Sequence, residues 1–270
     1  MKFLGDRIAF RPEAGQVPAG FRPLTEFPLV ILVGLTGVGK STILELLPQY
    51  GLTFTLLPNR REVTDDLIIA LLQAEAGETP HPVKDRIERF EYTARYREKY
   101  PGGMAHALSR LLIEAAQSES LFIFDGLRGL NEVQHAAAYF SQARFVVLDA
   151  PDTVRLNRLL QRGDLFDTAG SGLSPSTQSL METLQSVPHV TTIFSPEQLA
   201  QIARNSEAAQ IPADEVVQKL SIIVKERRNY DSGAARAYLV KTLPPERVLV
   251  VDTSTQSAEA AAQKVAVYLR

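Results

Sequence analysis

The 270-residue sequence contains no cysteine, which excludes disulfides, thiolate zinc sites and cysteine nucleophiles. Its four histidines are scattered and show no metal-ligand spacing. No apolar run approaches the roughly 20 residues that a membrane-spanning helix needs, and the first residues lack the apolar stretch of a signal peptide. A cytoplasmic protein without a membrane partner is therefore expected.

The charge is balanced, with 29 basic residues against 31 acidic ones and a formal net charge of -2. A chain of this charge has no overall attraction to nucleic acid, so a nucleic-acid partner is not expected. The hydrophobic share of 45% is enough for a sizeable core. We expect one large domain, or one domain with an insertion.

Short apolar runs alternate with amphipathic segments along most of the chain. The runs "PLVILVG", "LTFTLL", "LFIFDG", "RFVVLDA" and "RVLVVDT" are typical of strands buried on both faces of a parallel sheet. Helical spacing is found between them, including residues 67–76, 83–100, 104–117 and 130–141. This alternation predicts an α/β fold, a three-layer sandwich around a mostly parallel sheet.

Composition divides the chain into four parts. Residues 1–27 are rich in proline and glycine and are expected to form an irregular arm. Residues 28–169 are expected to form the α/β core, and residues 244–270 to complete it with a strand and a helix. Between them, 170–243 is interpreted as a helical insertion or lid, with a loop rich in serine and glycine near 164–190.

The segment "GLTGVGKS" matches the phosphate-loop pattern G-x-x-x-x-G-K-[ST], and it lies between an expected strand and an expected helix. Glycine leaves room for backbone N–H groups to surround a phosphate, and the following helix adds its dipole. Lys40 is expected to reach the β- and γ-phosphates, and Ser41 to bind Mg²⁺. The expected nucleotide-binding residues are Gly34, Leu35, Thr36, Gly37, Val38, Gly39, Lys40, Ser41 and Thr42.

Asp125 ends the apolar run "LFIFDG", at the edge of the sheet where ligands of open α/β folds bind. This position suits a carboxylate that anchors Mg²⁺ or its water ligands. The alternative is that Asp125 only caps the turn before the next helix.

Residues 120–168, with "FIFDGLRGLNEVQHAAAYF" and "FVVLDAPDTVRLNRLLQRGDLFD", together with the phosphate loop, resemble the nucleoside-monophosphate-kinase-like branch of the P-loop kinases. Archaeal relatives of dephospho-CoA kinase are the most similar, and adenylate kinase is similar more loosely. The resemblance implies a kinase that uses ATP and Mg²⁺. It also implies that Arg158 and Arg162 are lid arginines that neutralise the transferring phosphoryl group; the alternative is a solvated helix face.

The segment "LLPNRREVTDD" departs from that family, which leaves the acceptor unidentified. Arg60 or Arg61 is a candidate for binding an anionic group of the acceptor, because a guanidinium fork suits phosphate or carboxylate. Asp65 or Asp66 could orient an acceptor hydroxyl, although "VTDD" also reads as a helix N-cap with acidic first-turn residues. Arg128, which follows Asp125 in "DGLRG", is the stronger acceptor candidate.

Three functions are compatible with these features. The first is ATP-dependent phosphoryl transfer to a nucleotide or another small molecule. The second is a regulatory NTPase that hydrolyses ATP or GTP slowly and signals to a protein partner. The third, processing of nucleic acid, would need a basic groove. No Asn-Lys-x-Asp element for guanine occurs, so ATP is the expected donor.

Overall fold

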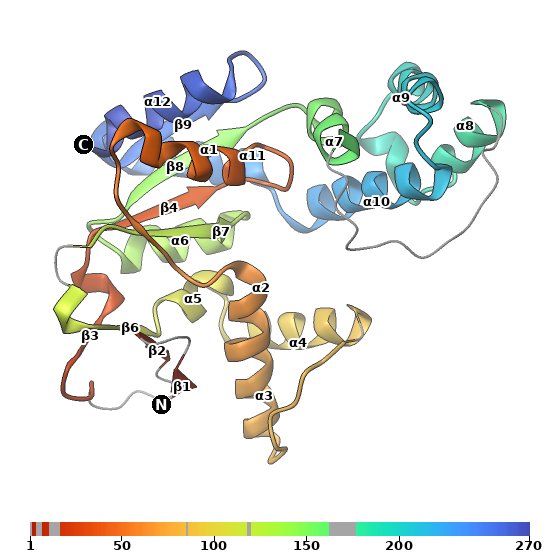
Figure 1. The fold of residues 1–270 in the computed structure, drawn as a ribbon. Helices are drawn as coiled ribbons and strands as arrows, with labels where there is room; N and C mark the ends of the chain where they lie inside the picture. Colours follow the sequence, from red (N-terminus) through yellow and green to blue (C-terminus); the bar gives the residue numbers. More distant parts are fainter. Residues whose placement is uncertain (1, 4–6, 11–16, 85, 118–119, 162–176) are drawn as a thin grey trace.

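The computed structural model describes residues 2–3, 7–10, 17–84, 86–117, 120–161 and 177–270 (Figure 1). Its main sheet has five strands, all parallel, in the spatial order β5-β7-β4-β8-β9. The strands are β4 (Leu29–Val33), β5 (Thr55–Leu56), β7 (Phe122–Leu127), β8 (Arg144–Asp149) and β9 (Val248–Asp252). The expected run at 52–57 is a strand only at Thr55–Leu56, on the edge of the sheet.

The central strand β4 is buried on both faces, as its continuous apolar sequence predicts. Leu29 and Ile31 belong to one hydrophobic cluster, whereas Val30 and Leu32 belong to another on the opposite face. Helices α1 (Lys40–Leu46) and α12 (Ala258–Leu269) cover the second cluster, and α6 (Leu130–Tyr139) and α11 (Ser232–Thr242) cover the first. Figure 1 shows α1 and α12 over the sheet and α6 beneath it, so the expected three-layer α/β fold is confirmed. In the part of the chain described here, no helix is both long and apolar enough to span a bilayer.

A second sheet, antiparallel and in the order β1-β2-β6-β3, involves residues for which strands were not expected. Its strands are β1 (Lys2–Phe3), β2 (Ile8–Phe10), β3 (Phe21–Pro23) and β6 (Leu111–Glu114). The irregular arm expected at 1–27 therefore contains three short strands. The helix expected at 104–117 is also wrong, because only α5 (Met104–Leu108) is helical before β6.

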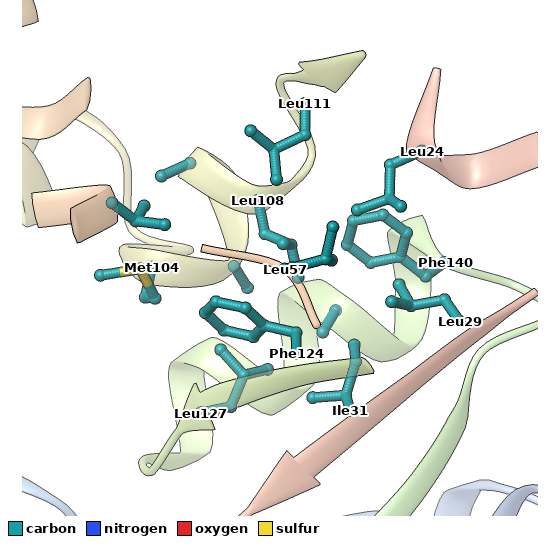
Figure 2. Close-up of a cluster of buried hydrophobic side chains, with 14 of the residues drawn as sticks. Leu24, Leu29, Ile31, Leu57, Met104, Leu108, Leu111, Phe124, Leu127 and Phe140 are labelled. Atoms are coloured by element: carbon teal, nitrogen blue, oxygen red, sulfur yellow. The ribbon is translucent and has the colours of Figure 1, made fainter. Parts of the chain in front are cut away.

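The second sheet packs onto the same core as the main sheet. Figure 2 shows Leu111 of β6 and Leu24, which follows β3, among Leu29 of β4, Leu108 of α5 and Phe140. The three apolar residues at 111–113 fit a helix or a strand equally well in isolation, and pairing with β2 and β3 selects the strand. The strand β6 is thus determined by residues about one hundred positions earlier in the chain.

After β5 the chain forms a helix that begins earlier than expected. Asn59 is its N-cap and makes a capping box with Glu62, so α2 (Arg60–Val63) starts seven residues before Leu67. A π-helical stretch (Thr64–Ile69) and α3 (Ala70–Glu75) continue it, and α4 (Arg86–Lys99) follows. The interpretation of "VTDD" as an N-cap is therefore wrong, because Thr64 lies inside the helix.

Four helices, α7 (Asp152–Gln161), α8 (Thr177–Gln185), α9 (Pro196–Ala208) and α10 (Ala213–Asn229), share a third hydrophobic cluster. Figure 1 shows them together beside the sheet. The loop expected near 164–190 is helical at Thr177–Gln185. Residues 162–176 lie outside the described residues, and Arg162 is among them.

Candidate nucleotide and acceptor sites

The loop between β4 and α1 has the geometry that its glycines predict. Gly37 has φ +85°, and a Cβ added to it would lie 2.9 Å from the Arg155 carbonyl oxygen. Gly39 has φ +94° and is the N-cap of α1. Any larger residue at Gly37 would both strain the backbone and clash. The loop lies at the carboxyl end of the central strand, between β7 and β8, which is the switch point where ligands of such sheets bind.

Lys40 lies at the start of α1 with its ammonium group turned toward the loop. Its Nζ donates to the carbonyl oxygens of Gly34 and Leu35, both at 3.0 Å, and lies 3.7 Å from Asp125 Oδ1. Burial lowers the pKa of Lys40, and the neighbouring arginines add to this, while Asp125 opposes it. An anionic ligand beside Lys40 would therefore stabilise the charged form of its side chain.

The residues expected to hold Mg²⁺ fit that ion. Asp125 Oδ1 is buried and, among the described residues, makes no hydrogen bond. Ser41 is exposed at the first turn of α1. The described part of the chain has no cluster of three or more His, Asp or Glu that could hold a metal alone. One hydroxyl and one carboxylate beside a phosphate loop match the way Mg²⁺ is shared between protein, water and nucleotide phosphates.

Thr36, at the tip of the loop, is held by a helix that is distant in sequence. Glu226 of α10 accepts hydrogen bonds from the Thr36 backbone N–H at 3.0 Å and from its hydroxyl at 2.6 Å. The Nε of Arg155 on α7 donates to the Thr36 carbonyl oxygen at 2.8 Å. The Thr36 backbone N–H was expected to bind phosphate. It donates instead to the Glu226 carboxylate.

Glu226 also neutralises two arginines. It accepts from Arg128 Nη1 at 2.6 Å and from Arg155 Nη2, and the Arg155 side chain is fully buried. Sequence analysis identified neither Glu226 nor Arg155 as site residues. Arg155 lies in the arginine-bearing helix interpreted above, but nothing in the local sequence around Glu226 indicates that it meets the loop.

A cavity of about 280 Å³, which we call the arginine cavity, lies next to this network. Five arginines and one carboxylate line it, together with aromatic, apolar and small polar residues. The charged residues are Arg60, Arg61, Arg89, Arg97, Arg128 and Glu132. All three expected acceptor-binding arginines, Arg60, Arg61 and Arg128, are therefore brought together in one cavity.

The expected acceptor residues differ in their partners. Arg60 donates to both oxygens of Glu132, at 2.7 and 3.1 Å, to the Gly126 carbonyl at 2.6 Å and to the Tyr230 hydroxyl at 2.9 Å. Arg61 has a side chain 75% exposed, and its nearest carboxylate, Asp65, is 3.9 Å away. Arg60 is thus a structural anchor of the cavity wall.

Asp65 does not line the arginine cavity. Its carboxylate forms an ion pair with Arg89 of α4. This contact ties the π-helical stretch to α4, so a role of Asp65 in orienting an acceptor remains a prediction.

A second cavity, of about 300 Å³, lies between α1, α7 and α12. Arg158 lines it together with Gly39, Thr42 and Thr253. Arg158 donates to the Thr253 hydroxyl at 2.9 Å, to the Thr253 carbonyl at 2.6 Å and to the Gly37 carbonyl at 3.3 Å. Its guanidinium therefore lies beside the loop, while its expected action on a transferring phosphoryl group remains a prediction.

No protein-family model and no curated protein matches the sequence. Among solved structures, an unliganded sugar kinase from Janibacter sp. aligns with a TM-score of 0.41 and 14% identity over 90% of this chain and 94% of that one. A gluconokinase from Sinorhizobium meliloti gives 0.35 and 12%, over 90% and 91%. A shikimate kinase from Acinetobacter baumannii, in complex with shikimate, gives 0.35 and 15%, over 88% and 90%. Scores of this size do not assign an activity.

Proposed function

We propose that the protein is a P-loop kinase that transfers the γ-phosphoryl group of ATP, with Mg²⁺, to a small-molecule acceptor. Within the P-loop kinases, its motifs favour the branch that resembles nucleoside-monophosphate kinases. One observation carries the proposal. The arginine cavity is joined to the phosphate loop by a continuous path of hydrogen bonds, from Arg128 through Glu226 to Thr36.

The residues divide into a nucleotide side and an acceptor side. Backbone N–H groups from Gly37 onward and the Lys40 ammonium would hold the phosphates, and the cavity lined by Arg158 and Thr253 would take the nucleoside. Ser41 and Asp125 would hold Mg²⁺, which neutralises the phosphate charge. The arginine cavity would hold the acceptor, and positioning of the two ligands supplies most of the catalysis in phosphoryl transfer.

A second candidate function, a slow regulatory NTPase, needs a nucleotide site and a surface for a protein partner. A regulatory NTPase does not require a second small-molecule cavity linked to the loop. The arginine cavity therefore favours the kinase.

The test is ATP consumption by the purified protein against a panel of nucleotides and cofactor precursors. Lys40→Ala should reduce turnover at least about 100-fold, because it removes the charge that stabilises the transferring phosphoryl group. The melting temperature should hardly change, since burial already disfavours the Lys40 ammonium. Lys264→Ala, at an exposed position of α12, is the control and should keep full activity.

Retained turnover in Lys40→Ala would refute the assignment of Lys40. If no member of the panel is phosphorylated and only a protein partner accelerates hydrolysis, the regulatory NTPase is the correct function.

A further inference from the structure

All three hydrogen-bonding groups of Thr36, at the tip of the phosphate loop, have partners. Its backbone N–H and its hydroxyl donate to the two oxygens of Glu226, at 3.0 and 2.6 Å, and its carbonyl oxygen accepts from Arg155 Nε at 2.8 Å. Glu226 lies on α10 and Arg155 on α7, so both partners belong to the helices beside the sheet. Both side chains are buried. These hydrogen bonds are therefore shielded from water and can fix the orientation of the loop backbone.

The contact with Glu226 orients one peptide group of the loop. A peptide group is planar and trans, so its N–H and its C=O point in opposite directions. The N–H of Thr36 and the carbonyl of Leu35 belong to the same peptide group. Because the N–H points to Glu226, the Leu35 carbonyl points away from α10, where it accepts from Lys40 Nζ at 3.0 Å. The carboxylate on α10 and the ammonium on α1 thus hold this peptide group from its two ends.

The next peptide group of the loop is fixed in the same way. The Thr36 carbonyl points to Arg155, so the Gly37 N–H points to the opposite side. This N–H is the first of the backbone donors that the proposed function assigns to the phosphates. Arg155 is itself held by ion pairs with Glu226 and Asp152. Glu226 therefore acts on both peptide groups, directly on one and through Arg155 on the other.

We propose that Glu226 is a positioning residue of the nucleotide site, which acts on the bound phosphates through Thr36 and Lys40. The proposal rests on the proposed function, because it requires that the loop binds a nucleotide. Glu226 orients the peptide group whose carbonyl holds Lys40, and it helps to orient the peptide group that carries the Gly37 N–H. A loop that is already oriented in the free protein loses less conformational freedom when a nucleotide binds, so its affinity for the nucleotide is higher.

A purely electrostatic effect of Glu226 would have the opposite sign. A carboxylate near an anionic ligand repels it, so removing the charge would tighten nucleotide binding. Loss of the loop orientation would weaken nucleotide binding instead. The direction of the change in affinity therefore distinguishes a positioning residue from a nearby negative charge.

The experiment measures the affinity of the full chain for Mg·ADP by calorimetry. The variants are Glu226→Gln, which keeps the size of the side chain but removes its charge, Thr36→Val, which keeps the shape but removes the hydroxyl, and the double variant. The matched control is Arg227→Gln. Arg227, the next residue of α10, pairs with Asp152 of α7 at 2.8 Å and donates to Ser232 Oγ at 2.7 Å. The control therefore weakens a contact between the same two helices at residues outside the loop.

Glu226→Gln should weaken Mg·ADP binding about tenfold, because charge-assisted hydrogen bonds to the loop are lost. Thr36→Val should weaken it about threefold, since one hydroxyl donor is lost. The double variant should bind Mg·ADP like Glu226→Gln alone, because both substitutions break the same contact. Arg227→Gln should bind Mg·ADP like the wild type, even if its melting temperature falls.

Unchanged or tighter binding in Glu226→Gln would overturn the proposal, as would additive effects in the double variant or an equal loss of affinity in Arg227→Gln. Thr36→Val leaves the ion pairs of Glu226 in place, so it tests the contact even if Glu226→Gln does not fold. Unchanged affinity in Thr36→Val would likewise overturn the proposal. Absence of Mg·ADP binding by the wild type is a separate outcome, because it would refute the nucleotide site itself and with it the proposed kinase function.

Discussion

The Glu226 carboxylate accepts the backbone N–H of Thr36 over 3.0 Å, although 190 positions separate the two residues. This contact joins the helices beside the sheet to the phosphate loop. Burial alone would raise the pKa of Glu226. The pKa is nevertheless lowered, because the charges of Arg128 and Arg155 and the hydrogen bonds from Thr36 stabilise the carboxylate. The carboxylate is therefore ionised at neutral pH.

Glu226→Gln should destabilise the protein by about 3 kcal/mol, because it removes the buried counter-charge of Arg128 and leaves the buried Arg155 with Asp152 as its ion-pair partner. Urea unfolding at pH 7 measures the loss. The difference in unfolding free energy between the variant and the wild type should shrink as the pH falls below the usual pKa range of a carboxylic acid. A lowered pKa of Glu226 stabilises the folded state at pH values above that range, and this contribution is lost as the carboxylate becomes protonated. Glu207→Gln, at an exposed position of α9, should change stability by less than about 0.5 kcal/mol, and a similar effect of both substitutions would contradict the role of Glu226.

Gly37→Ala should abolish Mg·ATP binding and cost about 3 kcal/mol of folding stability, from positive-φ strain and from the clash with Arg155. Gly20→Ala is the matched control. Gly20 has φ +84°, almost the same as Gly37, but no atom lies within 4 Å of the added Cβ. It should lose only about 1 kcal/mol, from the backbone strain, and should bind nucleotide normally. Normal nucleotide binding in Gly37→Ala would show that the loop does not hold phosphate.

Arg158→Ala should slow phosphoryl transfer more than it weakens ATP binding, because its guanidinium lies against the loop and would neutralise charge that develops on the transferring group. Single-turnover rates and calorimetric affinities for Mg·ATP separate the two effects. A weaker affinity with an unchanged rate would instead assign Arg158 to nucleoside binding, beside Thr253.

Stability should decrease between pH 6.5 and pH 4 partly because of His106. Burial, with the nearby charges of His135 and Arg110, lowers the pKa of His106 to about 4. The ring is hydrogen-bonded to Tyr96 and stacks on Tyr100. In this interval the unfolded chain binds a proton that the folded protein does not, so the free energy of unfolding falls as the pH is lowered.

Because His106 is partly exposed to solvent, we expect this loss to be about 1–2 kcal/mol, less than the full conversion of the shift. Chemical unfolding at pH 7 and pH 5 measures it. His106→Gln, which cannot titrate, should reduce the difference between the two pH values. An unchanged difference would assign the pH dependence to other groups.

The main sheet and the loop could be predicted from sequence because their signals are local. A run such as Leu29–Val33 is too apolar for anything but a doubly buried strand, and the glycine spacing of the loop defines its own turn. The strand at Leu111–Glu114 could not be predicted, since its three apolar residues become a strand only when β2 and β3 lie on either side.

The same distinction applies to the candidate site. Lys40 and Asp125 follow from motifs, and the structure places them 3.7 Å apart. Glu226 could not be found from sequence, because its role depends on how α10 packs beside the loop. Arg89 and Arg97 lie on α4, which carries several arginines, and only their position at the arginine cavity distinguishes these two from the others.

The strand β6 takes both of its neighbours, β2 and β3, from the first 23 residues. A shortened version of the protein that started at Pro28, just before the phosphate-loop strand, would leave two bare edges on an apolar strand and uncover part of the core beneath it. Such a fragment would offer those edges to other copies of itself. Expression work on this protein should therefore keep the first segment, although it contains no residue of either cavity.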